Sequence, residues 1–143
     1  IGVDANPTAI AYANELSTAY PEVHFKTEDI FSEEFQKREF DVVLATLFLH
    51  HFKEEPLVSF LDNTLKQTKI GVVVNDLHRH TLAYYLFMLL SVFIKNKMII
   101  EDGLTSVLRG FKRKDLMDLS KKLQVKPQIS WKWAFRFQWI LKR

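Results

Sequence analysis

The most informative part of the chain is Phe40-Asp41-Val42-Val43-Leu44-Ala45-Thr46, followed closely by Leu49-His50-His51-Phe52. Residues 40–46 are an almost unbroken apolar run, which is typical of a strand buried inside a parallel sheet. A second such run covers residues 70–75, and Glu55-Pro56 opens a helical pattern between the two. Strands that alternate with helices predict an α/β fold with a mostly parallel sheet.

The same alternation extends toward the N-terminus. Residues 1–4 form an apolar run that ends on Asp4, and residues 23–26 form another that precedes Glu28-Asp29-Ile30. Between them, Asn6-Pro7 is a typical helix start, because Asn caps a helix and Pro fits its first position. We predict a helix from there to about Tyr20.

The C-terminal half contains two strand-like runs and two helical segments. Residues 125–131 and 133–141 are predicted strands, with Trp131, Trp133, Phe135 and Trp139 expected in the core. Residues 111–123 predict a helix with Leu116, Leu119 and Leu123 facing inward. Residues 82–94 are apolar on every side of a helix but too short to span a bilayer, so we expect them to be buried or covered by a partner.

Four stretches, in this order and spacing, resemble the later motifs of class I S-adenosylmethionine-dependent methyltransferases. They are Ile1-Gly2-Val3-Asp4, Glu28-Asp29-Ile30, Phe40 to Thr46, and Leu49-His50-His51-Phe52. The last two together are the most specific. The resemblance covers nearly the whole chain, is weakest over residues 78–105, and is closest to small-molecule enzymes of the type 11/12 group. It implies a Rossmann-like, mostly parallel sheet with flanking helices and a C-terminal antiparallel hairpin.

The resemblance implies S-adenosylmethionine as the cofactor. Asp4 would accept charge-assisted hydrogen bonds from two ribose hydroxyls, and Asp29 would recognise the adenine amino group. Leu47 would line the methionine end. The full set of implied cofactor-binding residues is Asp4, Ala5, Asp29, Ile30, Thr46 and Leu47. Ligands in open α/β sheets bind beyond the carboxyl ends of the strands, so these residues are expected along one edge.

Three histidines are candidate general bases, because imidazole titrates near neutrality and can take a proton from a hydroxyl. They are His51, His78 and His80. Candidate substrate contacts are His50, Arg79, Tyr84 and Tyr85. For each of these residues there is an alternative without a functional role. One of His50 and His51 could pack under the next helix, and Arg79 could form a surface ion pair. The two tyrosines could simply pack against neighbouring residues of their helix. No carboxylate or cysteine spacing accompanies the histidines, so no metal is expected.

The predicted reaction is transfer of a methyl group from the sulfonium to a small, hydrophobic or aromatic acceptor. We expect one methyltransferase domain over residues 1–143, with residues 77–110 as a helical lid over that acceptor. The alternative is a non-catalytic methyltransferase-like domain that forms a homodimer or contacts a membrane through residues 82–94. A dehydrogenase is a further rival, disfavoured by Asp29 and by the Leu49 to Phe52 motif.

The family's first motif, a strand and a glycine-rich turn, is expected upstream of Ile1. Its strand would lie in the middle of the sheet, between the strand that ends at Asp4 and the strand that ends at Thr46. Without it, we expect two half-sheets with open edges, and weak or no cofactor binding by these 143 residues.

The amino-acid composition indicates which compartment and which partners to expect. The chain has no cysteine, which fits a reducing, cytoplasmic compartment, and its composition is that of a globular protein. The net charge of +3 is uneven, because residues 101–143 hold eleven Lys or Arg against four Asp or Glu. The basic residues of the helix after Phe111 are expected to form its solvated face rather than a nucleic-acid site.

Overall fold

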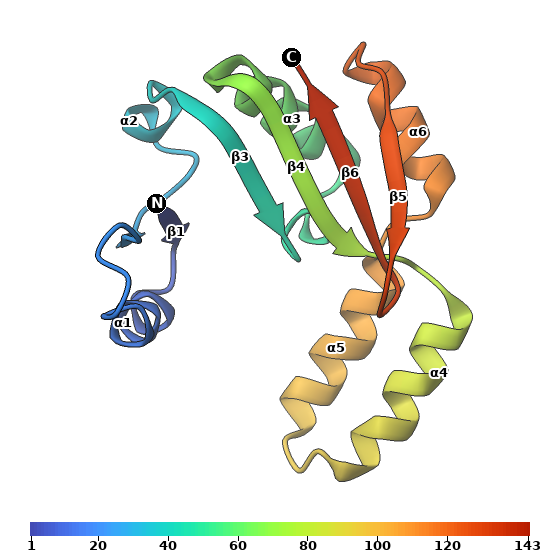
Figure 1. Cartoon of the computed structure of the whole chain (residues 1–143). Helices are drawn as coiled ribbons and strands as arrows, with labels where there is room; N and C mark the ends of the chain where they lie inside the picture. Colours follow the sequence, from blue (N-terminus) through green and yellow to red (C-terminus); the bar gives the residue numbers. More distant parts are fainter. The chain divides into compact units, whose positions relative to one another are not determined.

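The computed structural model describes all 143 residues, which form two compact units (Figure 1). The first unit is Ile1–Arg38 and the second is Glu39–Arg143. The prediction that the whole chain is a single domain therefore stays a prediction.

The first unit is a strand–helix–strand unit followed by one helical turn. Strands β1 (Gly2–Asp4) and β2 (Phe25–Thr27) pair in parallel, with helix α1 (Pro7–Leu16) between them and helix α2 (Glu33–Gln36) after them. The side chain of Asn6 accepts hydrogen bonds from the backbone N–H groups of Thr8 and Ala9, which confirms the predicted helix start. The helix ends before the predicted Tyr20.

The second unit contains a four-stranded sheet in the order β3-β4-β6-β5. Strand β3 (Phe40–Thr46) is parallel to β4 (Thr68–Leu77). Strands β5 (Gln128–Lys132) and β6 (Arg136–Lys142) form an antiparallel hairpin, and β6 pairs antiparallel with β4. The predicted fold class and closing hairpin are confirmed. The β1–β2 pair forms its own sheet, so the strands lie in two sheets, as expected.

One face of this sheet carries the core. Helix α3 (Glu54–Gln67) and helix α6 (Arg113–Lys122) supply apolar residues to it, and the largest fully buried side chain is Trp139 of β6. The Trp139 indole N–H donates to Ser120 Oγ at 3.0 Å, which satisfies its one polar atom. The buried members of the core are Ala45, Leu49, Leu57, Leu61, Leu65, Val72, Val74, Phe111, Leu116, Leu119, Phe137, Trp139 and Leu141.

Between β4 and α6 the chain forms a helical hairpin at the carboxyl end of β4 (Figure 1). It consists of α4 (Thr81–Leu90), a 3-10 turn η2 (Ser91–Phe93) and α5 (Lys97–Arg109). The expectation that residues 82–94 are buried is wrong for most of them, since only Ala83 and Ser91 are buried there. Helix α4 is apolar all round, but α5 covers only one side of it. None of the helices is both long and apolar enough to cross a bilayer.

The C-terminal hairpin differs from the prediction at its turn. Residues 133–135 were predicted to begin the last strand, but they form the turn, where Ala134 and Phe135 have φ of 61° and 52°. Trp131 and Trp133 are exposed rather than in the core, because they lie at and beyond the end of the edge strand β5. Trp139 is buried as predicted, on the same face as Phe137 and Leu141, whereas Phe135 is only half-buried.

Candidate functional site

Two carboxylates lie at the carboxyl ends of the neighbouring strands of the first unit. Asp4 ends β1 and is exposed, and one of its oxygens, Oδ1, accepts a hydrogen bond from the backbone N–H of Asn6 at 2.7 Å. Asp29 follows β2, and its Oδ1 accepts from the Phe31 N–H at 2.9 Å. Both carboxylates thus fix local turns while remaining at the surface. Ala5 is exposed and Ile30 is half-buried beside them.

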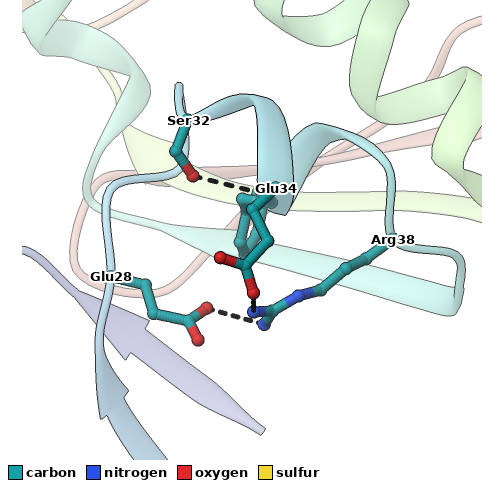
Figure 2. Close-up of polar contacts among 5 residues, drawn as sticks. Glu28, Ser32, Glu34 and Arg38 are labelled. Carbon is teal, nitrogen blue, oxygen red and sulfur yellow. Dashed lines mark hydrogen bonds and ion pairs between the residues drawn. The ribbon is translucent and has the colours of Figure 1, made fainter.

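An ion-pair network holds the segment that carries Asp29 (Figure 2). Arg38 donates from Nη1 to Glu28 Oε2 at 2.7 Å and from Nη2 to Glu34 Oε1 at 3.4 Å. The hydrogen bond to Glu28 raises the pKa of Arg38 further above its ordinary value. Ser32 Oγ accepts from the Phe35 N–H and caps α2. Figure 2 shows the guanidinium reaching both glutamates, so the loop after β2 is tied at both of its ends.

In the second unit, a buried aspartate joins the ends of β3 and β4. Asp76, near the end of β4, is 1% exposed. Its Oδ1 contacts His50 Nδ1 at 2.6 Å and accepts from the Leu77 N–H at 2.7 Å. Its Oδ2 accepts from the backbone N–H groups of Leu49 and His50 at 2.8 and 3.3 Å. One carboxylate therefore fixes the 3-10 turn η1 (Leu49–His51) that follows β3.

The sequence analysis did not assign Asp76 a role. A usable signal was present, because Val72, Val74 and Asp76 are spaced by two and so point to the same face of a strand. Two of these residues are apolar and face the core, so the third needs buried hydrogen-bond partners.

The turn between β3 and η1 contains a strained residue. Leu47 has φ of 51°, in the left-handed region that costs a residue with a side chain about 1–2 kcal/mol. Its N–H donates to the carbonyl of Asn75 at 2.9 Å, which continues the β3–β4 ladder into the turn. Backbone strain of this kind concentrates at functional sites. Thr46 and Leu47, both implied cofactor contacts, are exposed at this position.

A polar row crosses the sheet at the same level, on the face opposite the core. Thr46, Asn75, Gln138 and Ser130 are successive partners across the four strands. Asn75 Oδ1 and Arg136 Nε, both of which lie on this face by the strand register, are buried without a hydrogen-bond partner. His78 Nδ1 also lacks a partner, but His78 follows β4 and its ring packs on the core residue Phe137. Buried polar atoms are normally paired, so these atoms are available to a bound polar group.

The structure brings some of the predicted histidines together and separates others. The rings of His50 and His51 lie 4.2 Å apart, and those of His78 and His80 lie 5.1 Å apart. No ring contact or hydrogen bond joins His51 to His78. His50 was expected to contact substrate, but it is buried and bound to Asp76; the alternative, that one of this pair packs inward, describes its position. His51 is exposed.

The remaining predicted residues lie around the start of the α4–α5 hairpin. His80 Nδ1 accepts from the Leu82 N–H at 3.1 Å and caps α4, which occupies one ring nitrogen. Arg79 forms an exposed ion pair with Asp115 at 2.7 Å, which is the alternative to its predicted contact with substrate. Tyr84 is half-buried and Tyr85 exposed, with their rings 5.7 Å apart.

Burial lowers the pKa of His78, and the nearby charge of His80 lowers it further. We therefore expect NMR titration to give His78 a pKa below 6.5, and the His80→Gln variant to raise it part of the way back. Because the folded state holds a proton on His78 less readily than the unfolded state does, stability should fall as the pH drops through about 6.5. A His78 that titrates at or above 6.5 would contradict this placement.

A mixed-charge groove lies beside Arg79, with a volume of about 660 Å³. Its apolar floor is made by Phe52, Leu57, Phe111 and Leu119. Cationic and acidic side chains share its rim, and two cation–carboxylate pairs, Arg79 with Asp115 and Lys122 with Glu54, lie among them. The groove is therefore not strongly electropositive.

Residues 1–71 match the family model described as "Methyltransferase domain". A search of curated proteins finds no significant match. Among solved structures, the chain resembles magnesium protoporphyrin IX methyltransferase from Synechocystis PCC 6803, crystallised with SAH, at 12% identity and a TM-score of 0.57. This alignment covers 99% of the chain and 61% of that protein.

Two further structures give higher TM-scores. The plantazolicin methyltransferase BpumL, in complex with a pentazolic desmethylPZN analog and SAH, aligns with a TM-score of 0.68 and 16% identity over 99% of this chain and 66% of that one. An O-methyltransferase family protein from Burkholderia thailandensis aligns with a TM-score of 0.64 and 14% identity, over 96% of this chain and 41% of that one. At these identities the structures share the fold. Residues 1–71, just under half of the chain, thus match a methyltransferase domain, and the chain shares the fold of methyltransferases crystallised with SAM or SAH.

Proposed function

We propose that the chain takes part in methyl transfer from S-adenosylmethionine to a small, hydrophobic or aromatic acceptor. The observation that carries this proposal is the exposed Asp4 at the carboxyl end of β1, inside the segment that matches the methyltransferase family. The structures that it resembles include methyltransferases crystallised with SAM or SAH, which supports the choice of cofactor.

The residues of the first unit fit the cofactor. Only one oxygen of Asp4 is used by the Asn6 N–H, so the exposed carboxylate has acceptor capacity left for ribose hydroxyls. Asp29 and Ile30 follow the neighbouring parallel strand, where the carboxylate and the backbone of Ile30 would contact the adenine. When bound, the cofactor supplies an electrophilic methyl group.

The residues of the second unit fit the acceptor. Methyl transfer depends mainly on holding the nucleophile close to the methyl group with water excluded. Asn75 and Arg136 offer unpaired buried polar atoms that would orient the acceptor. Burial lowers the pKa of His78, which favours its uncharged form, and its Nδ1 has no partner, so it would accept the proton of an acceptor hydroxyl.

The apolar α4–α5 hairpin supports a hydrophobic acceptor. The hairpin follows His78 in the chain and would form a lid over the bound acceptor. A nucleic-acid acceptor is disfavoured, because the groove beside Arg79 combines carboxylates with its cations. The proposed function involves no nucleic-acid partner.

The test is a titration with S-adenosylhomocysteine followed by NMR, which detects weak binding. We expect S-adenosylhomocysteine to bind and NAD not to bind. Asp4→Asn should weaken binding about tenfold or more, since a charge-assisted hydrogen bond contributes about 1.5–3 kcal/mol. Asp41→Asn is the matched control, because Asp41 is an exposed strand aspartate bound only to Lys69. Binding of NAD alone would overturn the cofactor assignment.

A further inference from the structure

The end of the α4–α5 hairpin exposes a dense group of large apolar side chains. We define the hairpin tip as residues 89–99, which include the end of α4, the turn η2 and the start of α5. Its exposed apolar residues are Leu89 (65%), Leu90 (60%), Val92 (78%), Phe93 (84%), Met98 (72%) and Ile99 (52%). A soluble surface seldom gathers so many apolar side chains without a binding role.

The tip also carries an unpaired positive charge. Lys95 and Lys97 are the only charged residues between Thr81 and Ile100, both are exposed, and neither forms an ion pair. The nearest acidic residues in the sequence, Glu101 and Asp102, lie on α5 beyond the tip.

The hairpin is a folded element, not a frayed end. Phe87 of α4 packs so closely on Gly103 of α5 that a Cβ there would lie 2.3 Å from its ring. Ser91 Oγ donates to the Met88 carbonyl at 2.6 Å and closes α4, while Asn96 caps α5 by accepting from the Met98 N–H at 3.0 Å. The exposed apolar side chains are therefore presented by a fixed scaffold.

We propose that the hairpin tip docks on a lipid bilayer that contains anionic lipids. The apolar side chains would enter the boundary between headgroups and acyl chains, and Lys95 and Lys97 would reach the lipid phosphates. Docking of this kind needs no membrane-spanning helix. It does not rest on the proposed methyl transfer.

The charges favour a bilayer over a second copy of the chain. A symmetric dimer formed through the tip would bring the same patch of both copies together. Lys95 and Lys97 would then approach their own counterparts within an apolar interface, without an acidic residue of the tip to pair with them. An anionic membrane surface supplies the opposite charge directly.

The test is co-sedimentation of the full chain with two kinds of vesicle, phosphatidylcholine alone and phosphatidylcholine with phosphatidylglycerol. We expect tighter binding to the anionic vesicles. The double variant Val92→Ser and Phe93→Ser should bind both at least about tenfold more weakly, because two exposed apolar side chains no longer become buried. Lys95→Gln with Lys97→Gln should lose about fivefold per lysine on anionic vesicles only.

The matched control is Ile70→Ser, which removes an apolar side chain that is 62% exposed at the opposite end of β4 from the hairpin. It should leave vesicle binding unchanged, and circular dichroism should show that every variant is folded. The proposal is overturned if the chain does not bind anionic vesicles, or if Ile70→Ser reduces binding as much as the tip variants do. It is likewise overturned if the tip variants abolish a dimer and leave vesicle binding unchanged.

Discussion

Replacing Asp76 by Ala is expected to destabilise the second unit by about 3–5 kcal/mol, because several buried donors lose their acceptor and each such loss costs about 1–3 kcal/mol. The substitution leaves His50 Nδ1 and the backbone N–H groups of Leu49, His50 and Leu77 without their acceptor. It also removes the side-chain hydrogen bonds that join the turn after β3 to the end of β4. Urea unfolding of both proteins measures the effect.

The control for this prediction is Asp62→Ala. Asp62 pairs with Lys66 at 2.6 Å, but it lies on the surface of α3, where such a pair contributes less than about 1 kcal/mol. Asp76→Asn should fall between the two, because an amide keeps one acceptor oxygen and loses the other. Equal unfolding midpoints for Asp76→Ala and Asp62→Ala would contradict the role assigned to Asp76.

Replacing Gly71 by Ala is the second large effect, with an expected loss of about 2–4 kcal/mol from strain and overpacking. Gly71 has φ of 152°, and a Cβ there would lie 2.2 Å from the backbone carbonyl oxygen of Leu141. Because that atom belongs to the paired strand β6, it cannot move without shifting the sheet. The pairing of β3 with β4 is also irregular here, between Phe40 and Val42.

Gly103→Ala is the comparison for Gly71→Ala. A Cβ at Gly103 meets the ring of Phe87, which is a side chain that can turn aside, and Ala favours a helix by about 1 kcal/mol over Gly. Thermal unfolding should therefore show a much smaller change for Gly103→Ala. A loss for Gly103→Ala as large as that for Gly71→Ala would contradict this account of the sheet.

The positions of the strands followed from hydrophobic patterning, because the side chains of a strand alternate between its two faces, and the closing hairpin followed from the family resemblance. The same rule failed at Trp131 and Trp133, where the strand reaches a turn and large side chains remain exposed. Burial of the apolar helix at 82–94 also failed as a prediction. The sequence pattern of a helix indicates which of its faces are apolar. It does not indicate whether another element of the chain covers those faces.

The candidate site was predictable in part. The resemblance pointed to the carboxylates after β1 and β2 and to the turn after β3, and the structure places them at strand ends. The partnership of His50 with Asp76 was missed, because 26 residues separate the two and only the parallel pairing of β3 with β4 brings them together. The capping role of His80 depends on where α4 begins, which sequence patterns locate only approximately.

The most direct test of the central claim is to map the backbone amide signals that shift when S-adenosylhomocysteine is added to the full chain. The account predicts that the signals of Asp4, Ala5, Asp29 and Ile30 shift, that those of Thr46 and Leu47 shift with them, and that NAD leaves all six unchanged. If NAD shifts these signals, or if S-adenosylhomocysteine shifts signals elsewhere in the chain and none of these six, the proposed cofactor site is contradicted.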